Sequence, residues 1–517
     1  MVGATGFEPA TSRTPSECAT RLRYAPTQGG ACVPQVRGQV KGERLSCVKD
    51  YYAPLSPGSA CLVAARGVFG GMAPTHKRVL LFSYFFPPAA TGVRRVTSLV
   101  RHLPANGWEP VVLACKPVRG QGHDPGPLAD PAVADAPVVR CGSVDPYRLM
   151  QVLRPGQPGG GGDGTAAGAP RGKRLMETLR RHLFFPDDRC GWIPFAVAAA
   201  LVEVRRRRID ALYSSNYPQS THAAAWIVHR LTGLPWLADF RDGWTQNPAF
   251  HRPANTALAW LQQYGERRVA RDATAITTVS PPITRHLQAM RTPQSLPAET
   301  IFNGFEPGEW ESARAESGSA QPLNPGLITL LYAGTFFGRR RPDLFFGALR
   351  ILLRRHPHWR ERLRVRMRCA LDDRSLGLIE KWDLLDVVRL HPPVSFAEIV
   401  REQLRADACL LILEHGPGAD IMVSQKVFEY LAAGRPVFAL VPEGAAAEVL
   451  AATGGATVET SRNVQAAAKS LLRFLQAVED ARHPAPDPGQ VAAFDRSAQA
   501  RRIAALLDAI TPNPRAR

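Results

Sequence analysis

Several familiar patterns are missing from this sequence of 517 residues. Its nine cysteines include no C-x-x-C pair, and no histidine cluster lies near them at metal-ligand spacing, which argues against a zinc site or a disulfide scaffold. No apolar run reaches the roughly 18 residues that cross a bilayer, because the best candidate, Ile193 to Val204, contains Glu203 and runs into four arginines. The first residues also lack the apolar core of a signal peptide. We therefore expect a cytoplasmic protein without a resident metal or cofactor.

Lysine is scarce as well, with 8 lysines against 56 arginines in a chain of formal charge +19. Such a skew, beside abundant alanine, glycine and proline, is typical of a GC-rich coding sequence, and it explains the charge without a nucleic-acid partner. The alternative is attraction to an anionic surface. The apolar content of 45% is enough to build full cores, so the composition excludes disorder as a class and allows two or three domains.

Residues 1–71 show neither helical nor alternating periodicity and are rich in Pro, Gly, Ser and Thr. The segment GFEPATSRTPSECATRLRYAP resembles a stretch found at the head of reading frames that run through tRNA genes. We interpret residues 1–71 as a disordered leader from a mis-called start, with Met72 as the true start. A genuine disordered leader is the alternative.

From Arg78 onward, short apolar runs alternate with helical patterns, which predicts a parallel sheet covered on both faces. The first run, RVLLFSYF, is followed by a Pro-Pro loop and a helix through Val93 to Leu103. Residues 72–296 are predicted to form one Rossmann-like domain, interrupted by a Gly-rich insertion at 155–172. Its further strands are predicted at 110–114, 211–214, 236–240 and 275–279.

A second alternation predicts another doubly wound domain over residues 297–485. Its strands are predicted at 328–333, 363–369, 387–390, 408–413, 437–440 and 456–458. Residues 486–517 contain an amphipathic helix, from about Val491 to Ile510, that we expect to pack back on the first domain. Because open α/β sheets bind ligands at the carboxyl ends of their strands, two such domains facing each other form a cleft.

Four segments resemble the family 4-like (group 1) retaining glycosyltransferases of GT-B fold: FSYFFPPAATGVRRV, LADFRDGW, IFNGF and SQKVFEYLAAGRPV. The order of these segments and their placement after predicted strands make the combination more specific than any one of them. The resemblance covers nearly all of residues 77–510. It implies two Rossmann-like domains facing across a cleft, an N-terminal acceptor domain and a C-terminal domain that binds a nucleotide sugar.

The first domain supplies four candidate site residues. Gly92 lies between a strand and a helix, where backbone N–H groups approach a phosphate, although an ordinary turn also explains a lone glycine. Arg241 and Asp242 follow a buried strand, and the resemblance implies that Asp242 contacts sugar hydroxyls or the acceptor while Arg241 holds it by an ion pair. His222, at a probable helix start, is a further catalytic candidate, although a lone histidine is more often structural.

The second domain supplies the donor-binding candidates. Gly334, Arg339, Arg340 and Arg341 follow a strand, and guanidinium groups bind diphosphate oxygens bidentately. A solvated charge run is the alternative. Glu429 lies one helical turn after Lys426, and the resemblance implies that Glu429 accepts hydrogen bonds from the ribose hydroxyls. A simple helical Lys-Glu pair is the alternative.

Two further positions qualify this interpretation. The family pattern has a glutamate eight residues before Glu429, and this chain has Ile421 there, which leaves the donor-sugar contact to nearby backbone amides or absent. In IFNGF, Asn303 and Gly304 suit a hinge turn with positive φ.

The predicted function is transfer of a sugar from a nucleotide-diphosphate donor, with retention, to a carbohydrate or lipid-linked acceptor in cell-surface polysaccharide or glycolipid synthesis. No metal is required, since arginines can neutralise the leaving group and no Asp-x-Asp motif ends a strand. The helix face from Arg205 to Arg208 is a candidate for peripheral contact with an anionic membrane. The alternatives are a non-catalytic nucleotide-sugar-binding subunit and a nucleotide-sugar 2-epimerase of the same fold.

Overall fold

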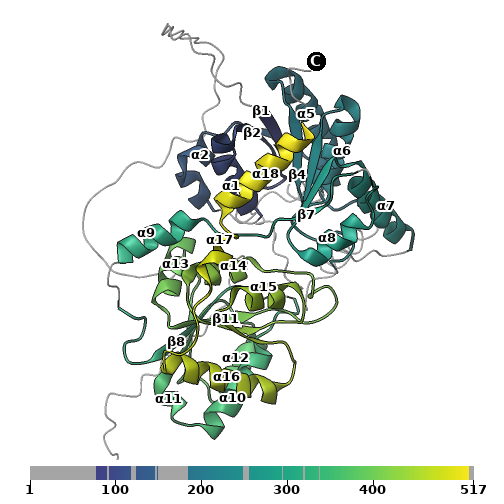
Figure 1. Ribbon diagram of the computed structural model, residues 1–517. Coiled ribbons are helices and arrows are strands. Elements are labelled where there is room, and N and C mark those ends of the chain that lie inside the picture. Colours follow the sequence, from purple (N-terminus) through teal and green to yellow (C-terminus); the bar gives the residue numbers. More distant parts are fainter. Residues whose placement is uncertain are drawn as a thin grey trace, which may run out of the picture. The chain divides into compact units, whose positions relative to one another are not determined.

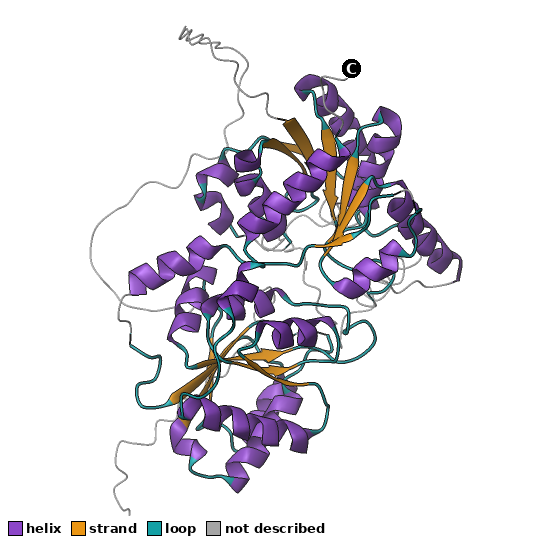
Figure 2. Cartoon of the chain, in the orientation of Figure 1, coloured by secondary structure: helices purple, strands orange, loops and turns teal. Residues whose placement is uncertain are grey.

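The computed structural model divides at Met72 into two units, and all described residues belong to the second. They are residues 77–89, 92–117, 124–145, 148, 184–247, 256–293, 295–317, 321–336 and 338–511. The predictions for residues 1–71, for Met72 and for the insertion at 155–172 lie outside the described residues. Figure 1 labels the elements, and Figure 2 shows strands flanked by helices throughout.

The first sheet is parallel and has the strand order β3-β2-β1-β4-β5-β6-β7. Its strands are β1 (Lys77–Phe82), β2 (Trp108–Cys115), β3 (Val138–Cys141), β4 (Ala211–Ser215), β5 (Trp236–Phe240), β6 (Ala275–Thr278) and β7 (Glu299–Thr300). The central strands β4 and β5 are buried on both sides, and their apolar residues are joined there by the buried polar side chains of Ser214, Ser215 and Asp239. The sequence patterns missed the two edge strands, β3 and β7, and β7 lies beyond residue 296, where the sequence places the domain boundary.

Helices cover both faces of this sheet. They are α1 (Arg94–His102), α2 (Pro131–Ala134), α5 (Ile193–Arg207), α6 (Ser220–Thr232), α7 (Thr256–Asp272) and α8 (Pro281–Gln288), with short 3-10 turns at η1 (Pro104–Asn106), η2 (Gly126–Ala129) and η3 (Cys190–Trp192). Residues of α5, α6 and α7 share one core with Leu80 and Phe82 of β1. The opposite face, with Val79 and Leu81, packs on α1. Successive side chains of β1 therefore pack alternately into two separate cores, one on each face of the sheet.

The second sheet is also parallel, in the order β10-β9-β8-β11-β12-β13. Its strands are β8 (Ile328–Ala333), β9 (Leu363–Arg368), β10 (Val388–His391), β11 (Ala408–Ile412), β12 (Val437–Leu440) and β13 (Ala456–Glu459). Its helices are α9 (Pro307–Ser317), α10 (Asp343–Arg355), α11 (Trp359–Arg362), α12 (Asp373–Lys381), α13 (Phe396–Arg405), α14 (Gln425–Ala433), α15 (Ala445–Thr453) and α16 (Val464–Glu479). The two sheets with helices on both faces form two Rossmann-like domains, which confirms the predicted α/β class.

The chain returns to the first sheet at its C-terminal end through α17 (Pro488–Ala492) and α18 (Arg496–Ile510). Apolar residues of α18, including Ile503 and Leu507, lie in the same core as Val79 and α1. The return runs beside the first connection, because Phe305 pairs with Asp495 in an isolated parallel bridge. No helix among the described residues is long and apolar enough to cross a membrane.

The glycine of this connection differs from the expectation. Neither Asn303 nor Gly304 has a positive φ. A Cβ at Gly304 would lie 2.1 Å from the Phe494 carbonyl oxygen, so the position excludes a side chain because the returning segment passes so close. The constraint is close approach of two backbones.

Candidate functional site

At the carboxyl end of the first sheet, one arginine holds two loops together. Arg241, which follows β5, donates a hydrogen bond to the carbonyl of Gly92 and another, 3.2 Å long, to the carbonyl of Tyr217. Gly92 has φ of +74°, and a Cβ there would lie 3.0 Å from Nη1 of Arg241. The structure thus brings Gly92 and Arg241 together, and both conformation and space require the glycine.

Asp242 lies in the same place and is partly accessible. Its backbone N–H donates to Oδ1 of Asn216 (3.1 Å), and its carbonyl accepts from Nδ2 of Asn216 (2.9 Å). Its carboxylate lies 3.5 Å from Nε of Arg241, with 24% of the side chain exposed. The backbone of Asp242 is fixed by a buried amide while its carboxylate faces a cation and solvent, which is the arrangement that a ligand-binding carboxylate needs.

His222 does not share this accessibility. Its side chain is fully buried in α6, with Phe240 at 4.5 Å between ring centroids. The indole of Trp236 donates to Oγ of Ser214, and the same hydroxyl forms a 2.7 Å hydrogen bond with Nδ1 of His222. Burial lowers the pKa of His222 to about 3, so the ring is neutral at pH 7. His222 therefore has the environment of a structural core histidine, and its position gives no support to the predicted catalytic role.

At the carboxyl end of the second sheet, three of the predicted donor-binding residues meet. Gly334 follows β8, and a Cβ there would lie 3.0 Å from Cε of Lys426. Lys426 lies in the first turn of α14, which Ser424 caps through a hydrogen bond to the Lys426 N–H. Nζ of Lys426 lies 3.4 Å from a carboxylate oxygen of Glu429, whose side chain is 6% exposed. Gly334, which has no side chain, the ammonium group of Lys426 and the carboxylate of Glu429 thus lie together.

The three arginines after Gly334 separate in the structure. Arg340 lines a small pocket whose other lining residues are Leu413, Glu414, Ala419, Met422 and Ser424. Arg339 lies beside it, donating to the carbonyl of Pro417 (3.0 Å) and approaching Glu414 at 3.4 Å. Arg341 instead pairs with Asp343 (3.1 Å) and Asp372 (3.0 Å). The predicted diphosphate role of Arg341 therefore has less geometric support than that of Arg340 and Arg339, because Arg341 already bridges two helix starts.

Ile421 is buried, and it contacts the first half of the chain. It belongs to the core that contains Trp244 and Phe240, and a Cβ at Gly243 would lie 3.1 Å from Cδ1 of Ile421. Ala419 and Met422, on either side of it, line the pocket beside Arg340. An apolar side chain thus connects the LADFRDGW loop to the pocket loop.

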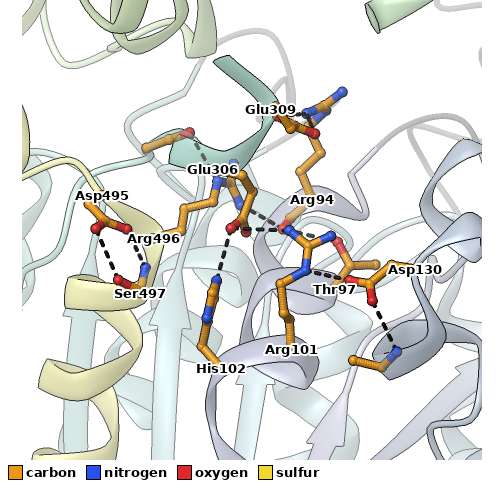
Figure 3. A network of polar contacts seen from close by, with 12 residues as sticks. Arg94, Thr97, Arg101, His102, Asp130, Glu306, Glu309, Asp495, Arg496 and Ser497 are labelled. Atoms are coloured by element: carbon orange, nitrogen blue, oxygen red, sulfur yellow. Dashed lines mark hydrogen bonds and ion pairs between the residues drawn. The ribbon is translucent and has the colours of Figure 1, made fainter. Parts of the chain in front are cut away.

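Sequence reasoning missed a polar network at the connection between the two sheets (Figure 3). Glu306 accepts from the ring of His102 (2.8 Å) and lies 3.1 Å from Nη1 of Arg101, both on α1. Burial acts to raise the pKa of Glu306, but the hydrogen bond to His102 and the charge of Arg101 outweigh it and hold the pKa at about 2. The carboxylate therefore stays ionised.

Arg496, at the start of α18, extends this network to helix α14. It donates to the carbonyls of Arg94 (2.6 Å) and Gly304 (3.0 Å), and its Nη2 lies 3.3 Å from Oε1 of Gln425. Gln425 precedes Lys426 and donates to the Gly304 carbonyl at 2.7 Å. The only available signal was the proximity of Glu306 to IFNGF, because the partners are up to 400 residues apart in the sequence.

Within the described residues, no group of three or more His, Cys, Asp or Glu side chains is arranged to hold a metal ion.

Comparisons with known proteins agree with this architecture. Residues 91–304 match the family model described as a glycosyl transferase 4-like domain. Two solved structures with TM-scores of 0.56 and 0.54 are a trehalose 6-phosphate synthase from Burkholderia multivorans and a glycosyltransferase from Rickettsia africae, each 12% identical to this chain. They cover 84% and 85% of this chain, and 99% of their own chains align. A sucrose-phosphate synthase from Thermosynechococcus elongatus has a TM-score of 0.52 at 16% identity, over 84% of this chain and 98% of its own.

One curated relative, a D-inositol 3-phosphate glycosyltransferase from Streptomyces griseus, is 28% identical over 182 residues, or 34% of this chain. The match spans 37% of that relative's length. The fold is that of the GT-B class. Residues 91–304 match the glycosyl transferase 4-like model, so this part of the chain resembles the family 4-like group of GT-B proteins.

Proposed function

We propose that this protein is a glycosyltransferase that moves a sugar from a nucleotide-diphosphate donor to an acceptor. The observation that carries the proposal is the meeting of Gly334, Lys426 and Glu429 at the carboxyl end of the second sheet, beside a pocket lined by Arg340. The name of the curated relative, a glycosyltransferase, and the match to a glycosyl transferase 4-like model support the reaction class.

Each of these groups has a chemical task in the proposed reaction. Glu429 accepts hydrogen bonds from the two ribose hydroxyls, because a carboxylate offers two acceptor oxygens. Lys426, Arg340 and Arg339 stabilise the negative charge that develops on the departing diphosphate. Gly334 lets the phosphates approach the backbone without a side chain in the way.

The first sheet supplies the acceptor side of the proposal. Asp242 orients a hydroxyl of the acceptor or donor sugar through its accessible carboxylate, and Arg241 fixes the loop that carries it. We propose that transfer proceeds with retention of the anomeric configuration, as the family resemblance implies. We also propose, from the same resemblance, that the acceptor is a carbohydrate or a lipid-linked sugar in cell-surface polysaccharide or glycolipid synthesis. A cytoplasmic location, expected from the sequence, is part of the proposal.

The donor site is tested by calorimetric titration of UDP, GDP and ADP into the full chain and into Glu429→Ala. We expect one diphosphate to bind, and its affinity to fall about 10- to 100-fold in the variant through loss of charge-assisted hydrogen bonds. Glu448→Ala, which removes an exposed glutamate from the neighbouring helix α15, is the matched control. Failure of all three diphosphates to bind would overturn the proposal.

A second candidate, a non-catalytic nucleotide-sugar-binding subunit, is favoured by one observation. Ile421 occupies the place of a glutamate in the family pattern, and its side chain is buried against Gly243 instead of being free to contact a sugar. Incubation of the protein with the sugar nucleotide of the diphosphate that binds separates the two candidates. Slow release of free sugar or transfer to added oligosaccharides supports the transferase, whereas tight binding without any turnover supports the subunit.

A further inference from the structure

Three helices of the first half, α5, α6 and α7, form one outer layer. All three contribute to the same core against one face of the sheet, through residues such as Ala200, Ala225 and Val269. Helix α6 contacts both of its neighbours, so the three helices lie side by side (Figure 1). The sides turned away from the core therefore belong to one surface.

This surface exposes large apolar side chains from every one of the three helices. The exposed fractions are 41% for Phe195, 60% for Val202, 64% for Leu231, 59% for Trp260, 37% for Leu261 and 51% for Tyr264. The rings of Trp260 and Tyr264 stack on each other, with centroids 5.4 Å apart. Single exposed apolar residues are ordinary, but a set shared by neighbouring helices indicates an interaction site.

The charges on the same three helices are almost all positive. The same three helices carry six exposed arginines: Arg205, Arg206, Arg208 at the C-cap of α5, Arg230, Arg267 and Arg271. The three helices carry only three acidic residues over their whole described length, and none of them is freely exposed.

Each of these three acids is engaged by a neighbour. Glu203 pairs with Arg207 and Arg206, and its side chain is 6% exposed. Glu266 is 1% exposed and lies 3.2 Å from His286. Asp272 pairs with Arg268 at 3.2 Å and accepts from the Trp226 indole. The outer surface thus presents arginine and apolar groups without a competing negative charge.

We propose that the α5–α7 surface, defined by Phe195, Val202, Leu231, Trp260, Leu261, Tyr264 and the six exposed arginines, binds the surface of an anionic phospholipid membrane. Tryptophan and tyrosine prefer the boundary between headgroups and acyl chains, aliphatic side chains enter it, and arginines pair with anionic headgroups. A nucleic acid would match the arginines alone and leave Val202, Leu231 and Leu261 without a role. The inference goes beyond the transfer reaction and stands without it.

Flotation of the full chain with vesicles tests this surface. We compare vesicles of phosphatidylcholine alone with vesicles of phosphatidylcholine and phosphatidylglycerol in equal parts, at low and high salt. Two double variants remove the two kinds of contact: Trp260→Ser with Tyr264→Ser, and Arg267→Glu with Arg271→Glu. The matched controls are Arg354→Glu with Arg355→Glu on α10 and Leu385→Ser, which change exposed residues of the second half.

We expect the wild type to float only with the anionic vesicles and to dissociate at high salt. Each double variant should lower the bound fraction at least about tenfold, since each basic residue near an anionic surface contributes roughly fivefold, whereas the controls should bind as the wild type does. Equal loss in the controls, or no flotation with either vesicle, overturns the proposal. A wild type that stays off vesicles but forms dimers that the Trp260 and Tyr264 changes dissolve overturns it in favour of self-association.

Discussion

The two sheets end differently at the edges where their candidate residues lie. In the first half, the side chains of Arg241 and Asn216 form hydrogen bonds with backbone carbonyls and N–H groups of neighbouring loops. In the second half, Lys426 and Glu429 contact mainly each other, at 3.4 Å, beside the Arg340 pocket. At the first edge, side-chain hydrogen bonds fix the loops and leave the Asp242 carboxylate accessible. At the second edge, charged side chains gather beside a pocket.

This difference teaches how one fold serves two tasks. Reorienting a braced loop costs several hydrogen bonds, so the Asp242 loop holds its geometry before any ligand arrives. The contact between Lys426 and Glu429 is long, at 3.4 Å, so both groups can exchange it for shorter contacts with a ligand that offers them new partners. Substitutions at the two edges should therefore separate binding from stability.

The largest expected effect is on ligand binding at the second edge. Lys426→Ala should weaken binding of the preferred nucleoside diphosphate about 100-fold, because an ammonium that meets phosphate oxygens forms charge-assisted hydrogen bonds. The free energy of unfolding should fall by only about 1 kcal/mol, because Lys426 is partly exposed but its removal leaves the buried Glu429 carboxylate without a cation. Calorimetry and urea unfolding measure the two quantities, with Lys469→Ala on α16 as control. A large loss of stability with intact binding would show that the comparison is drawn the wrong way round.

The next effect is on stability at the first edge. Arg241→Ala leaves the carbonyls of Gly92 and Tyr217 without their donor, and it should lower the free energy of unfolding by about 2 kcal/mol. Binding of the nucleoside diphosphate should stay within about threefold of the wild type, because the charged donor-binding candidates Lys426, Glu429 and Arg340 lie on the other sheet. Urea unfolding and calorimetry provide the numbers, with Arg285→Ala on the nearby helix α8 as control. A loss of diphosphate affinity comparable to that of Lys426→Ala would contradict the division of tasks.

A smaller effect distinguishes a buried histidine from a catalytic one. Because the folded pKa of His222, about 3, lies below its unfolded value of roughly 6.5, the unfolded state binds the extra proton. This contribution to stability is complete above pH 6.5 and falls by about 1.4 kcal/mol per pH unit between roughly pH 6 and 3. His222→Leu should flatten that part of the pH profile, measured by urea unfolding at pH 7.5, 6 and 5. An unchanged slope, or an activity loss at constant stability, would argue for a catalytic role.

The smallest effect concerns the contact between the two halves. Ile421→Val removes one methylene from the contact with Gly243 and Trp244, which should lower the free energy of unfolding by about 1 kcal/mol. The indole of Trp244 should fluoresce at longer wavelength if water enters, and because the chain has nine tryptophans its signal is taken as the difference between spectra recorded with and without Trp244→Phe. Val423→Ala, at a buried position of the second half alone, is the control for a general loss of packing. No change in either signal would show that Ile421 contributes nothing to joining the loops.

The sequence was most informative about features that depend on residues close together in the chain. Short, predominantly apolar segments predict buried parallel strands, and the central strands β1, β4, β5, β8, β11 and β12 all lie where such segments occur. Edge strands escaped, because β3 is only half-buried and β7 has two residues, too few to show a pattern. The proximity of Gly334, Lys426 and Glu429 also followed from the rule that parallel strands end at a common edge.

What escaped prediction depended on long-range contacts. The sequence of His222 and its neighbours is the same whether the ring faces a substrate or Phe240, and only the packed core decides between them. In the sequence, Arg341 cannot be distinguished from Arg340, because both belong to a run of three arginines. In the structure, ion pairs with Asp343 and Asp372 hold Arg341 away from the pocket that Arg340 lines. The partners of Glu306 come from two distant segments, α1 and the start of α18, so no local sequence pattern indicates them.

The pairing of Phe305 with Asp495 means that two stretches of chain, bound to each other, connect the sheets. A protease that cut the chain once near residue 303 would not release the halves, since α17 and α18 still link the second sheet to the core of the first. The nicked molecule should migrate as two fragments in denaturing gel electrophoresis and as one particle in gel filtration. The fold should thus persist after a single cut in the segment that connects the two sheets.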